Sequence, residues 1–266
     1  LVLDFRDPWT QWFDSGYRSE PKLRENIEKI IETKVLRSAN AVVGTTPDIT
    51  MYLKMRSRNK SCKFHTIYNG FDRDDFESIS PMRFNKYTIV YTGKIQKDLY
   101  SPMPILLAIN ELLSRRRELS DSFEVLFLGA FNDDSSALYI QKNDLKPNVK
   151  ILGYLPHHLS VSYMLGADTL LLLLNPGVTD RLTISGKIFE YLYARKRILG
   201  IVPQRSLAAE IVIEAKAGKV ISPQNIEEIS LELERLIEGD NQLISNYNFE
   251  KYNRELQAQE LMTVFD

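Results

Sequence analysis

Cysteine is nearly absent from this sequence of 266 residues, and histidine is scarce. The single cysteine, Cys62, has no partner for a disulfide within the chain, so we expect a reducing, cytoplasmic environment. The three histidines, His65, His157 and His158, do not follow the spacing of a metal site. The sequence therefore argues against a disulfide-stabilised domain and against a bound metal.

The chain also lacks an excess of charge and a long apolar run. Its formal net charge is −1, which gives no electrostatic reason to expect nucleic acid or an anionic membrane as the main partner. The longest leucine-rich run, TLLLLL at 169–174, is far too short to span a bilayer, and no signal peptide opens the chain. With 44% apolar and 26% charged residues, the composition is that of an ordinary globular protein.

Short β-branched or leucine-rich runs alternate with segments of helical period along most of the chain. Continuously apolar strands that alternate with helices predict a parallel sheet covered on both faces, which is a doubly wound α/β fold. The expected strands include 40–44, 63–68, 87–93, 123–129, 149–153, 169–174, 197–202 and 218–222. One expected helix, 103–119, gathers on one face the residues Ile105, Leu106, Ile109, Leu112 and Leu113.

The segment 69–85 is polar, contains Gly, Asp, Ser and Pro, and has no clear period, so we interpret it as an interdomain connector. The residues after it, 86–240, contain six expected strands, enough for a complete doubly wound domain. The residues before it, 1–68, contain only three strands and two helices. They indicate the end of an α/β domain whose beginning is missing. The chain also starts with Leu1 inside a strand-like run, so we expect a truncated form.

In open α/β sheets, ligands bind outside the carboxyl ends of the strands. The first strand after the connector ends in YTGKIQK, where Gly93 permits a close backbone approach and Lys94 and Lys97 supply charge. The third strand ends in LGYLP, and the fourth leads through a long loop into SGKIFEYLYARKR. Because these loops open on one edge of the sheet, their lysines, glycines and helix start predict an anion site, best suited to a pyrophosphate.

The segment SGKIFEYLYARKR (185–197) places a lysine where a helix disfavours one. Ser185 and Gly186 are typical of a helix start, so Lys187 falls in the first turn, where unpaired N–H groups make the field positive. A phosphate bound there would resolve the conflict, and Glu190 would then be placed to accept hydrogen bonds from a ribose diol. Two plainer interpretations stay open: Lys187 as a surface lysine with its head in water, and Glu190 as an exposed carboxylate.

An ordered series of motifs resembles family four of the retaining glycosyltransferases over nearly the whole chain. The motifs are SANAVVGTTPDITMYL, IYNGFD, IVYTGKI, VKILGYLP, SYMLGADTLLLL, SGKIFEYLYARKRILGIV and AGKVIS. The resemblance implies the GT-B fold, with 86–240 as the nucleotide-sugar-binding Rossmann-like domain and 1–68 as the end of the acceptor-side domain. It also implies that 241–266 forms a C-terminal helix that crosses back to the first domain.

The activity implied by the resemblance is transfer of a sugar, hexosyltransferase-like and with retention, in glycan biosynthesis or a related pathway. The donor would be a nucleoside-diphosphate sugar, and the acceptor a glycan, a lipid or a small molecule. Such enzymes use no required metal or other cofactor, and preorganised N–H groups and lysines stabilise the leaving diphosphate. The missing domain leaves room for peripheral association with a membrane.

The resemblance also carries residue roles. Glu190 matches the second glutamate of the family's E-x7-E motif, which holds the donor ribose, and Lys94 matches the basic position that faces the diphosphate. The implied nucleotide-sugar-binding residues are Gly93, Lys94, Lys97, Tyr154, Leu155, Ser185, Gly186, Lys187 and Glu190, with Lys94, Lys187 and Glu190 as the catalytic group. The turn at Tyr154 and Leu155 would present its backbone to the base.

The sequence departs from the family's pattern at two points. The first glutamate of E-x7-E falls on Leu182, with Asp180 two residues away as a candidate substitute. The family's second basic residue after Lys94 is missing, and Lys97 or Lys187 would supply that charge. On the acceptor side, Arg6 and Asp7 of LDFRDPW are candidate contacts, with a buried Arg–Asp structural pair as the alternative.

Two other function classes stay open. A sugar-nucleotide epimerase of the same fold would require catalytic carboxylates and histidines in its site, and this chain has few. A non-catalytic nucleotide-binding or scaffold domain would keep the nucleotide site alone. A dehydrogenase would require G-x-G-x-x-G after its first strand, and YTGKIQKD lacks that pattern.

Overall fold

The computed structural model describes residues 1–177, 180–239 and 249–265. It divides into two compact units. The first unit comprises residues 1–71, 177–186 and 250–266, and the second unit comprises residues 72–176 and 187–249. No helix of the described ranges is long and apolar enough to cross a membrane.

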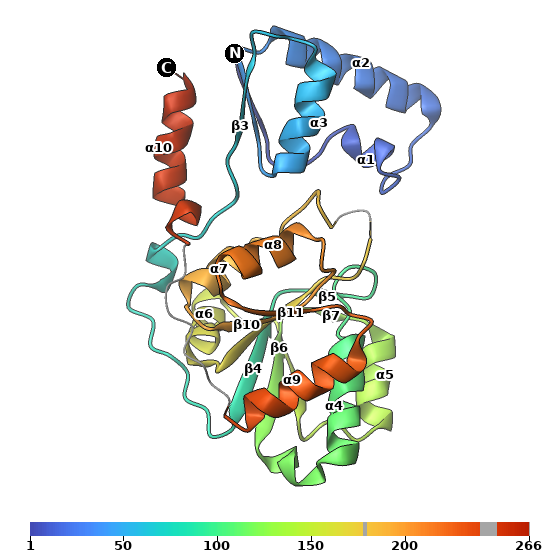
Figure 1. Ribbon diagram of the computed structural model, residues 1–266, viewed down its shortest axis with the longest axis vertical. Helices are drawn as coiled ribbons and strands as arrows, with labels where there is room; N and C mark the ends of the chain where they lie inside the picture. Colours follow the sequence, from blue (N-terminus) through green and yellow to red (C-terminus); the bar gives the residue numbers. More distant parts are fainter. Residues whose placement is uncertain (178–179, 240–248, 266) are drawn as a thin grey trace. The chain divides into compact units, whose positions relative to one another are not determined.

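A six-stranded parallel sheet forms the centre of the second unit (Figure 1). Its strand order is β11-β10-β9-β4-β6-β8, which is the Rossmann order with the reversal between β4 and β9. The strands are β4 (Tyr87–Thr92), β6 (Phe123–Leu128), β8 (Val149–Gly153), β9 (Thr169–Leu173), β10 (Arg197–Ile201) and β11 (Gly218–Ile221). Two two-residue strands, β5 (Ile95–Gln96) and β7 (Phe131–Asn132), pair with each other beyond the ends of β4 and β6.

Helices cover both faces of this sheet (Figure 1). On one face, α4 (Met103–Arg115), α5 (Asp134–Lys142) and α9 (Ile226–Ile237) enclose an apolar core that contains Ile89 and Tyr91 of β4. The opposite face carries α6 (His157–Gly166), α7 (Lys187–Tyr193) and α8 (Leu207–Glu214). There the Tyr191 hydroxyl of α7 accepts the backbone N–H of Thr92 at 2.9 Å. Short 3-10 turns lie at Asp74–Phe76 and Arg117–Asp121.

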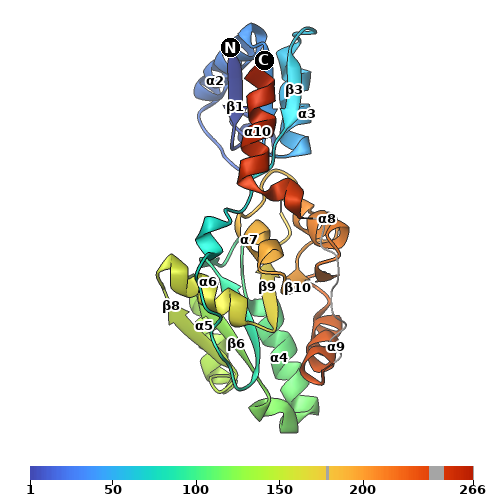
Figure 2. The same ribbon diagram turned by 90° about the vertical axis from the view of Figure 1, so that its left-hand side faces the viewer.

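The first unit is a three-stranded parallel sheet in the order β1-β2-β3, built from Val2–Phe5, Ala41–Gly44 and Lys63–Thr66. Helices α2 (Lys22–Ser38) and α3 (Pro47–Ser57) cover one face, where Leu36 and Leu53 are buried. Helix α10 (Arg254–Phe265) lies along the other face (Figure 2) and packs Val264 against β2. A short α1 (Gln11–Asp14) and a 3-10 turn (Glu250–Tyr252) complete the unit.

The doubly wound parallel architecture expected from the sequence is confirmed. Each of the strands 40–44, 63–68, 87–93, 123–129, 149–153, 169–174, 197–202 and 218–222 forms within two residues of its expected bounds, and the 103–119 helix ends four residues early. The contact grouping differs from the sequence-based boundaries at 177–186, which belongs to the first unit. The Arg181 guanidinium ties that segment to α3 by an ion pair with Asp48 at 3.1 Å. Of the C-terminal helix expected at 241–266, residues 241–248 and 266 lie outside the described residues.

Candidate functional site

Three glycines with positive φ follow each other across the carboxyl ends of β4, β6 and β8. Gly93, Gly129 and Gly153 have φ of 110°, 126° and 74°, conformations that side chains rarely adopt. The N–H of Gly93 donates to the carbonyl of Leu128, and the N–H of Gly129 donates to the carbonyl of Gly153, each at 2.7 Å. This glycine row therefore brings the backbone of three neighbouring strand ends into direct contact beside the reversal of strand order.

Lys187, the first residue of α7, points its side chain into this edge. Its Nζ donates to the Tyr91 hydroxyl at 2.7 Å and lies 3.9 Å from the centroid of the Tyr91 ring and 5.1 Å from that of Tyr100. A Cβ at Gly93 would stand 2.9 Å from the same Nζ, and the φ of 110° disfavours any other residue, so glycine suits this close approach. The interpretation of Lys187 as a surface lysine with its head in water is therefore wrong, because α7 directs the side chain over the end of β4.

The surroundings of Lys187 disfavour its charge. Removal from water lowers the pKa of Lys187 to about 7, and the Glu190 carboxylate opposes that shift only in part. The aromatic faces of Tyr91 and Tyr100 attract a cation but replace few of the hydrogen bonds that water would give. A polyanion bound at this edge would supply the missing negative charge.

The loop after β4 is held by a residue that the sequence reasoning missed. Asn175, which follows β9, donates through Nδ2 to the carbonyl of Lys97 at 2.7 Å. Its backbone N–H donates to the carbonyl of Leu99 at 2.8 Å, and its Oδ1 accepts the N–H of Ser101 at 3.2 Å. A polar amide directly after a buried strand was the available signal. The side chains of Lys94 and Lys97 themselves are exposed on this loop.

Glu190 lies one turn beyond Lys187, and its side chain is 30% exposed. Its Oε1 is 3.8 Å from Nε2 of His157, the first residue of α6. The fold thus places His157, at the start of α6, beside the expected ribose ligand. A carboxylate with this exposure is accessible to a ligand while one side of it packs in the helix.

The remaining expected residues divide between the two units. In the second unit, Tyr154 follows β8 and is 84% exposed, and Leu155 next to it is half-buried. Ser185 and Gly186 directly precede Lys187 in the chain and belong to the first unit by contact grouping. The structure thus brings Gly93, Lys187 and the Tyr91 hydroxyl together, with Glu190 one helical turn away.

Leu182 and Asp180, the positions around the missing first glutamate, also belong to the first unit. Leu182 is buried, with 7% of its surface exposed. The Asp180 carboxylate accepts the N–H of Gly177 at 3.0 Å, and burial raises its pKa. Its place as a substitute for the glutamate stays a prediction.

In the first unit, Arg6 donates through Nε and Nη2 to one carboxylate oxygen of Asp4, at 2.9 Å and 2.6 Å. Both side chains are partly exposed, and Asp7 is exposed as well. The buried Arg6–Asp7 pair considered from the sequence is therefore wrong. Arg6 instead lines a cavity of about 200 Å³ with Gly70, Arg254 and Gln257, beside the start of α10.

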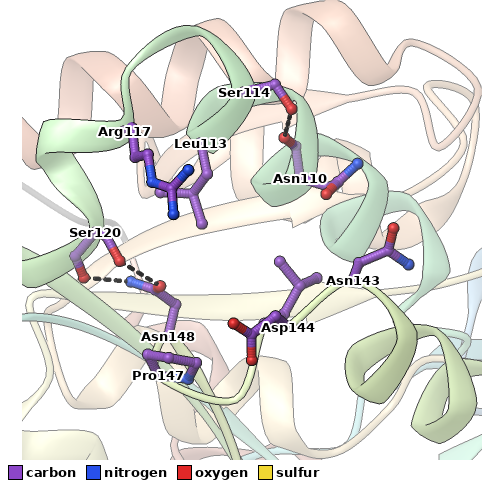
Figure 3. A pocket seen from close by; sticks show the side chains of 10 residues that line it. Asn110, Leu113, Ser114, Arg117, Ser120, Asn143, Asp144, Pro147 and Asn148 are labelled. Atoms are coloured by element: carbon purple, nitrogen blue, oxygen red, sulfur yellow. Dashed lines mark hydrogen bonds between the residues drawn. The ribbon is translucent and has the colours of Figure 1, made fainter.

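The second unit has a cavity of about 300 Å³ at the opposite end of its sheet (Figure 3). Asn148, before β8, donates there to the carbonyls of Ser120 and Phe123 at 2.7 Å and 3.0 Å. These bonds fix the amino ends of β6 and β8, so the Asn148 side-chain amide has a structural role in this cavity. Within the described ranges, no group of three or more His, Cys, Asp or Glu side chains could hold a metal ion.

Comparison with known proteins identifies the architecture. No family model matches the chain, and no curated protein does. HepE of Anabaena, in complex with UDP, superposes with a TM-score of 0.70 at 13% identity, over 99% of this chain and 71% of HepE. The chain has the GT-B fold.

Two further structures of this fold are similar. TarM of Staphylococcus aureus, in complex with fondaparinux, a GlcNAc-glycerol and UDP, gives a TM-score of 0.64 at 13% identity, over 88% of this chain and 46% of TarM. Sucrose-phosphate synthase of Thermosynechococcus elongatus gives 0.65 at 13% identity, over 99% of this chain and 66% of the synthase. The chain thus spans between about half and three quarters of these proteins. At this identity the likeness establishes the fold and not the substrate.

Proposed function

We propose that this chain is the donor-binding part of a glycosyltransferase that moves a sugar from a nucleoside-diphosphate donor to an acceptor. The observation that carries the proposal is the position of the Lys187 amine, held against Gly93 at the reversal of strand order in the second unit. Glu190 supports it, because an accessible carboxylate one turn away suits a ribose diol. The UDP in the similar HepE and TarM structures supports a nucleotide of this kind.

The proposed chemistry follows from charge. Cleavage of a glycosyl–phosphate bond places negative charge on the departing diphosphate, and fixed donors that meet this charge accelerate the step. Lys187 supplies the nearest cation, the loop of Lys94 and Lys97 supplies further charge, and the glycine row permits a close approach of the backbone. The proposal also includes transfer with retention of configuration and without a required metal.

Calorimetry with the 1–266 chain tests the proposal. We expect UDP, GDP or ADP, or a sugar conjugate of one of them, to bind with a Kd below about 1 mM. Glu190→Ala should weaken that binding more than tenfold, because two hydrogen bonds from the ribose to a charged acceptor are lost. Glu118→Ala, at the opposite end of the sheet and paired with Arg116, is the matched control and should bind as the wild type does.

Two results would contradict the proposal. One is the absence of binding by all three nucleotides at millimolar concentration. The other is a Glu190→Ala protein that melts at a lower temperature yet keeps its nucleotide affinity, which would make Glu190 a structural partner within the helix packing. Incubation of the nucleotide sugar with acceptor candidates then separates transfer from epimerisation, because an epimerase converts the donor without an acceptor.

A further inference from the structure

Tyr91 is a core residue with an outward-reaching hydroxyl. It has no exposed surface, and its ring packs against Phe127 at 5.8 Å between centroids. Its hydroxyl reaches the carboxyl end of β4, where it donates to the carbonyl of Lys94 at 3.0 Å and accepts from Lys187 Nζ at 2.7 Å. We propose that Tyr91 is a positioning residue of the diphosphate site, which holds the Lys187 amine beside Gly93 and couples it to the Lys94 loop. This inference rests on the proposed function.

The direction of both hydrogen bonds follows from the number of hydrogens that each group carries. A tyrosine hydroxyl has one hydrogen, and here it points to the Lys94 carbonyl, so its lone pairs face the amine. Burial raises the pKa of Tyr91, so the hydroxyl keeps this hydrogen throughout the neutral range. The rigid packing of the ring fixes the oxygen, and the oxygen in turn fixes the far end of a side chain with four rotatable bonds. Tyr91 therefore reduces the freedom that Lys187 would lose on binding a diphosphate.

The groups around the amine determine how its charge responds to a ligand. They are Tyr91 from β4, Tyr100 from the loop before α4 and Glu190 from α7, with His157 of α6 beside Glu190. Among these groups Glu190 offers a carboxylate, and its charge opposes the loss of the Lys187 proton only in part. A bound diphosphate would favour the protonated amine. Diphosphate affinity should therefore fall as pH rises above the pKa of Lys187 in the free protein, about 7.

Tyr91→Phe and Tyr87→Phe form a matched pair for the test. Tyr87 lies on the same strand and the same sheet face, and its hydroxyl bonds Thr169 at 2.7 Å at the amino end of β4. We expect Tyr91→Phe to weaken UDP binding about tenfold and to leave uridine binding unchanged, since only the diphosphate meets Lys187. Tyr87→Phe should lower the melting temperature without changing either affinity.

The pH dependence of UDP affinity and a double-mutant cycle distinguish a positioning tyrosine from a purely structural one, because loss of a structural tyrosine would change neither result. Above about pH 7 the wild-type affinity for UDP should fall, by at most tenfold per pH unit, and in Tyr91→Phe the fall should begin at lower pH. Lys187→Met should flatten the profile. Tyr91→Phe combined with Lys187→Met should lose no more UDP affinity than Lys187→Met alone, because the two side chains act through one hydrogen bond.

The inference is overturned if Tyr91→Phe keeps the wild-type ratio of UDP to uridine affinity and the wild-type pH profile, even when it melts at a lower temperature. Additive losses in the double variant would also overturn it, and this cycle is informative even if each single variant is less stable. Failure of the wild type to bind UDP, GDP and ADP removes the proposed function and the inference together. Wild-type binding with an unaffected Tyr91→Phe removes the inference alone.

Discussion

Lys187 shows at the scale of one residue how a fold can keep a cation where it is poorly solvated. The side chain sits against two aromatic rings and one hydroxyl, and the loss of water lowers its pKa to about 7 from the ordinary 10.5. Such a group costs free energy in the empty protein and interacts strongly with any anion that enters. That combination distinguishes it from the exposed Lys94 and Lys97 nearby.

Because the folded protein disfavours the charge of Lys187, Lys187→Met should gain stability, and the gain should depend on pH. Between pH 7 and 10.5 the unfolded chain holds a proton on this lysine that the folded chain has lost, so wild-type stability rises with pH across that window. The methionine variant has no titrating group at this position, so its stability lacks this rise with pH. Its advantage should therefore be larger at pH 6 than at pH 9, by about 1–2 kcal/mol, reduced from the full linkage value because the side chain keeps some contact with water.

Urea denaturation at both pH values measures this difference. Lys196→Met, near the end of the helical segment, is the control for loss of a positive charge as such and should show the same change at both pH values. An advantage of Lys187→Met that is equal at pH 6 and pH 9, or absent at both, would mean that the amine is well solvated in the folded chain.

The functional role of a residue could be predicted from the sequence only where a local pattern marks that residue. Lys187 stands out because a lysine in a first helical turn opposes the helix dipole, and Gly93 is marked by its place directly after an apolar strand. Tyr91 does not stand out, because within YTIVYTG it is one more large apolar residue of a buried strand. Its hydroxyl contacts Lys187, 96 positions further along the chain, and only the tertiary fold reveals such a pair.

At the scale of elements, the glycine row makes the carboxyl edge of the sheet compact. A Cβ on Gly129 would overlap the carbonyl group of Gly93, and its φ of 126° is unfavourable for other residues. We expect Gly129→Ala to lower the free energy of unfolding by about 1–3 kcal/mol and to weaken UDP binding, because the loop that carries Gly93 must shift.

Gly239→Ala is the control for backbone strain alone. Gly239 has a φ of 90°, but a Cβ there would meet no atom of the described residues within 4 Å. It should therefore destabilise the chain modestly and leave UDP affinity as it is. If Gly129→Ala binds UDP as tightly as Gly239→Ala does, the close packing of strand ends has no part in the site. Calorimetry and thermal melting of the two variants decide the matter.

Element positions were largely predictable because strands and helices are encoded by local period. The six apolar runs of the second unit became its six long strands, in the order that a doubly wound sheet requires. The two-residue strands β5 and β7 were not predictable, since two residues carry no period. The Asn175 contacts were also missed, because they depend on β9 lying next to β4 in space and not in sequence.

In the molecule as a whole, we propose that a nucleoside diphosphate binds at the carboxyl edge of the second unit's sheet. The fold supports this placement, since the strand order reverses between β4 and β9 beside Gly93. The cavity around Asn148 lies at the amino ends of the strands, where the Asn148 amide donates to the carbonyls of Ser120 and Phe123. The two ends of one sheet thus give two distinct places where a nucleotide could be found.

A crystal structure of the 1–266 chain grown with UDP would locate the nucleotide and so test this placement. We predict that a diphosphate oxygen lies within about 3 Å of Lys187 Nζ and that the ribose hydroxyls donate to the Glu190 carboxylate. Tyr91 should keep its hydrogen bond to the Lys94 carbonyl. UDP bound elsewhere, for example in the cavity around Asn148, or with its ribose away from Glu190 and its phosphates away from Lys187, would contradict the account.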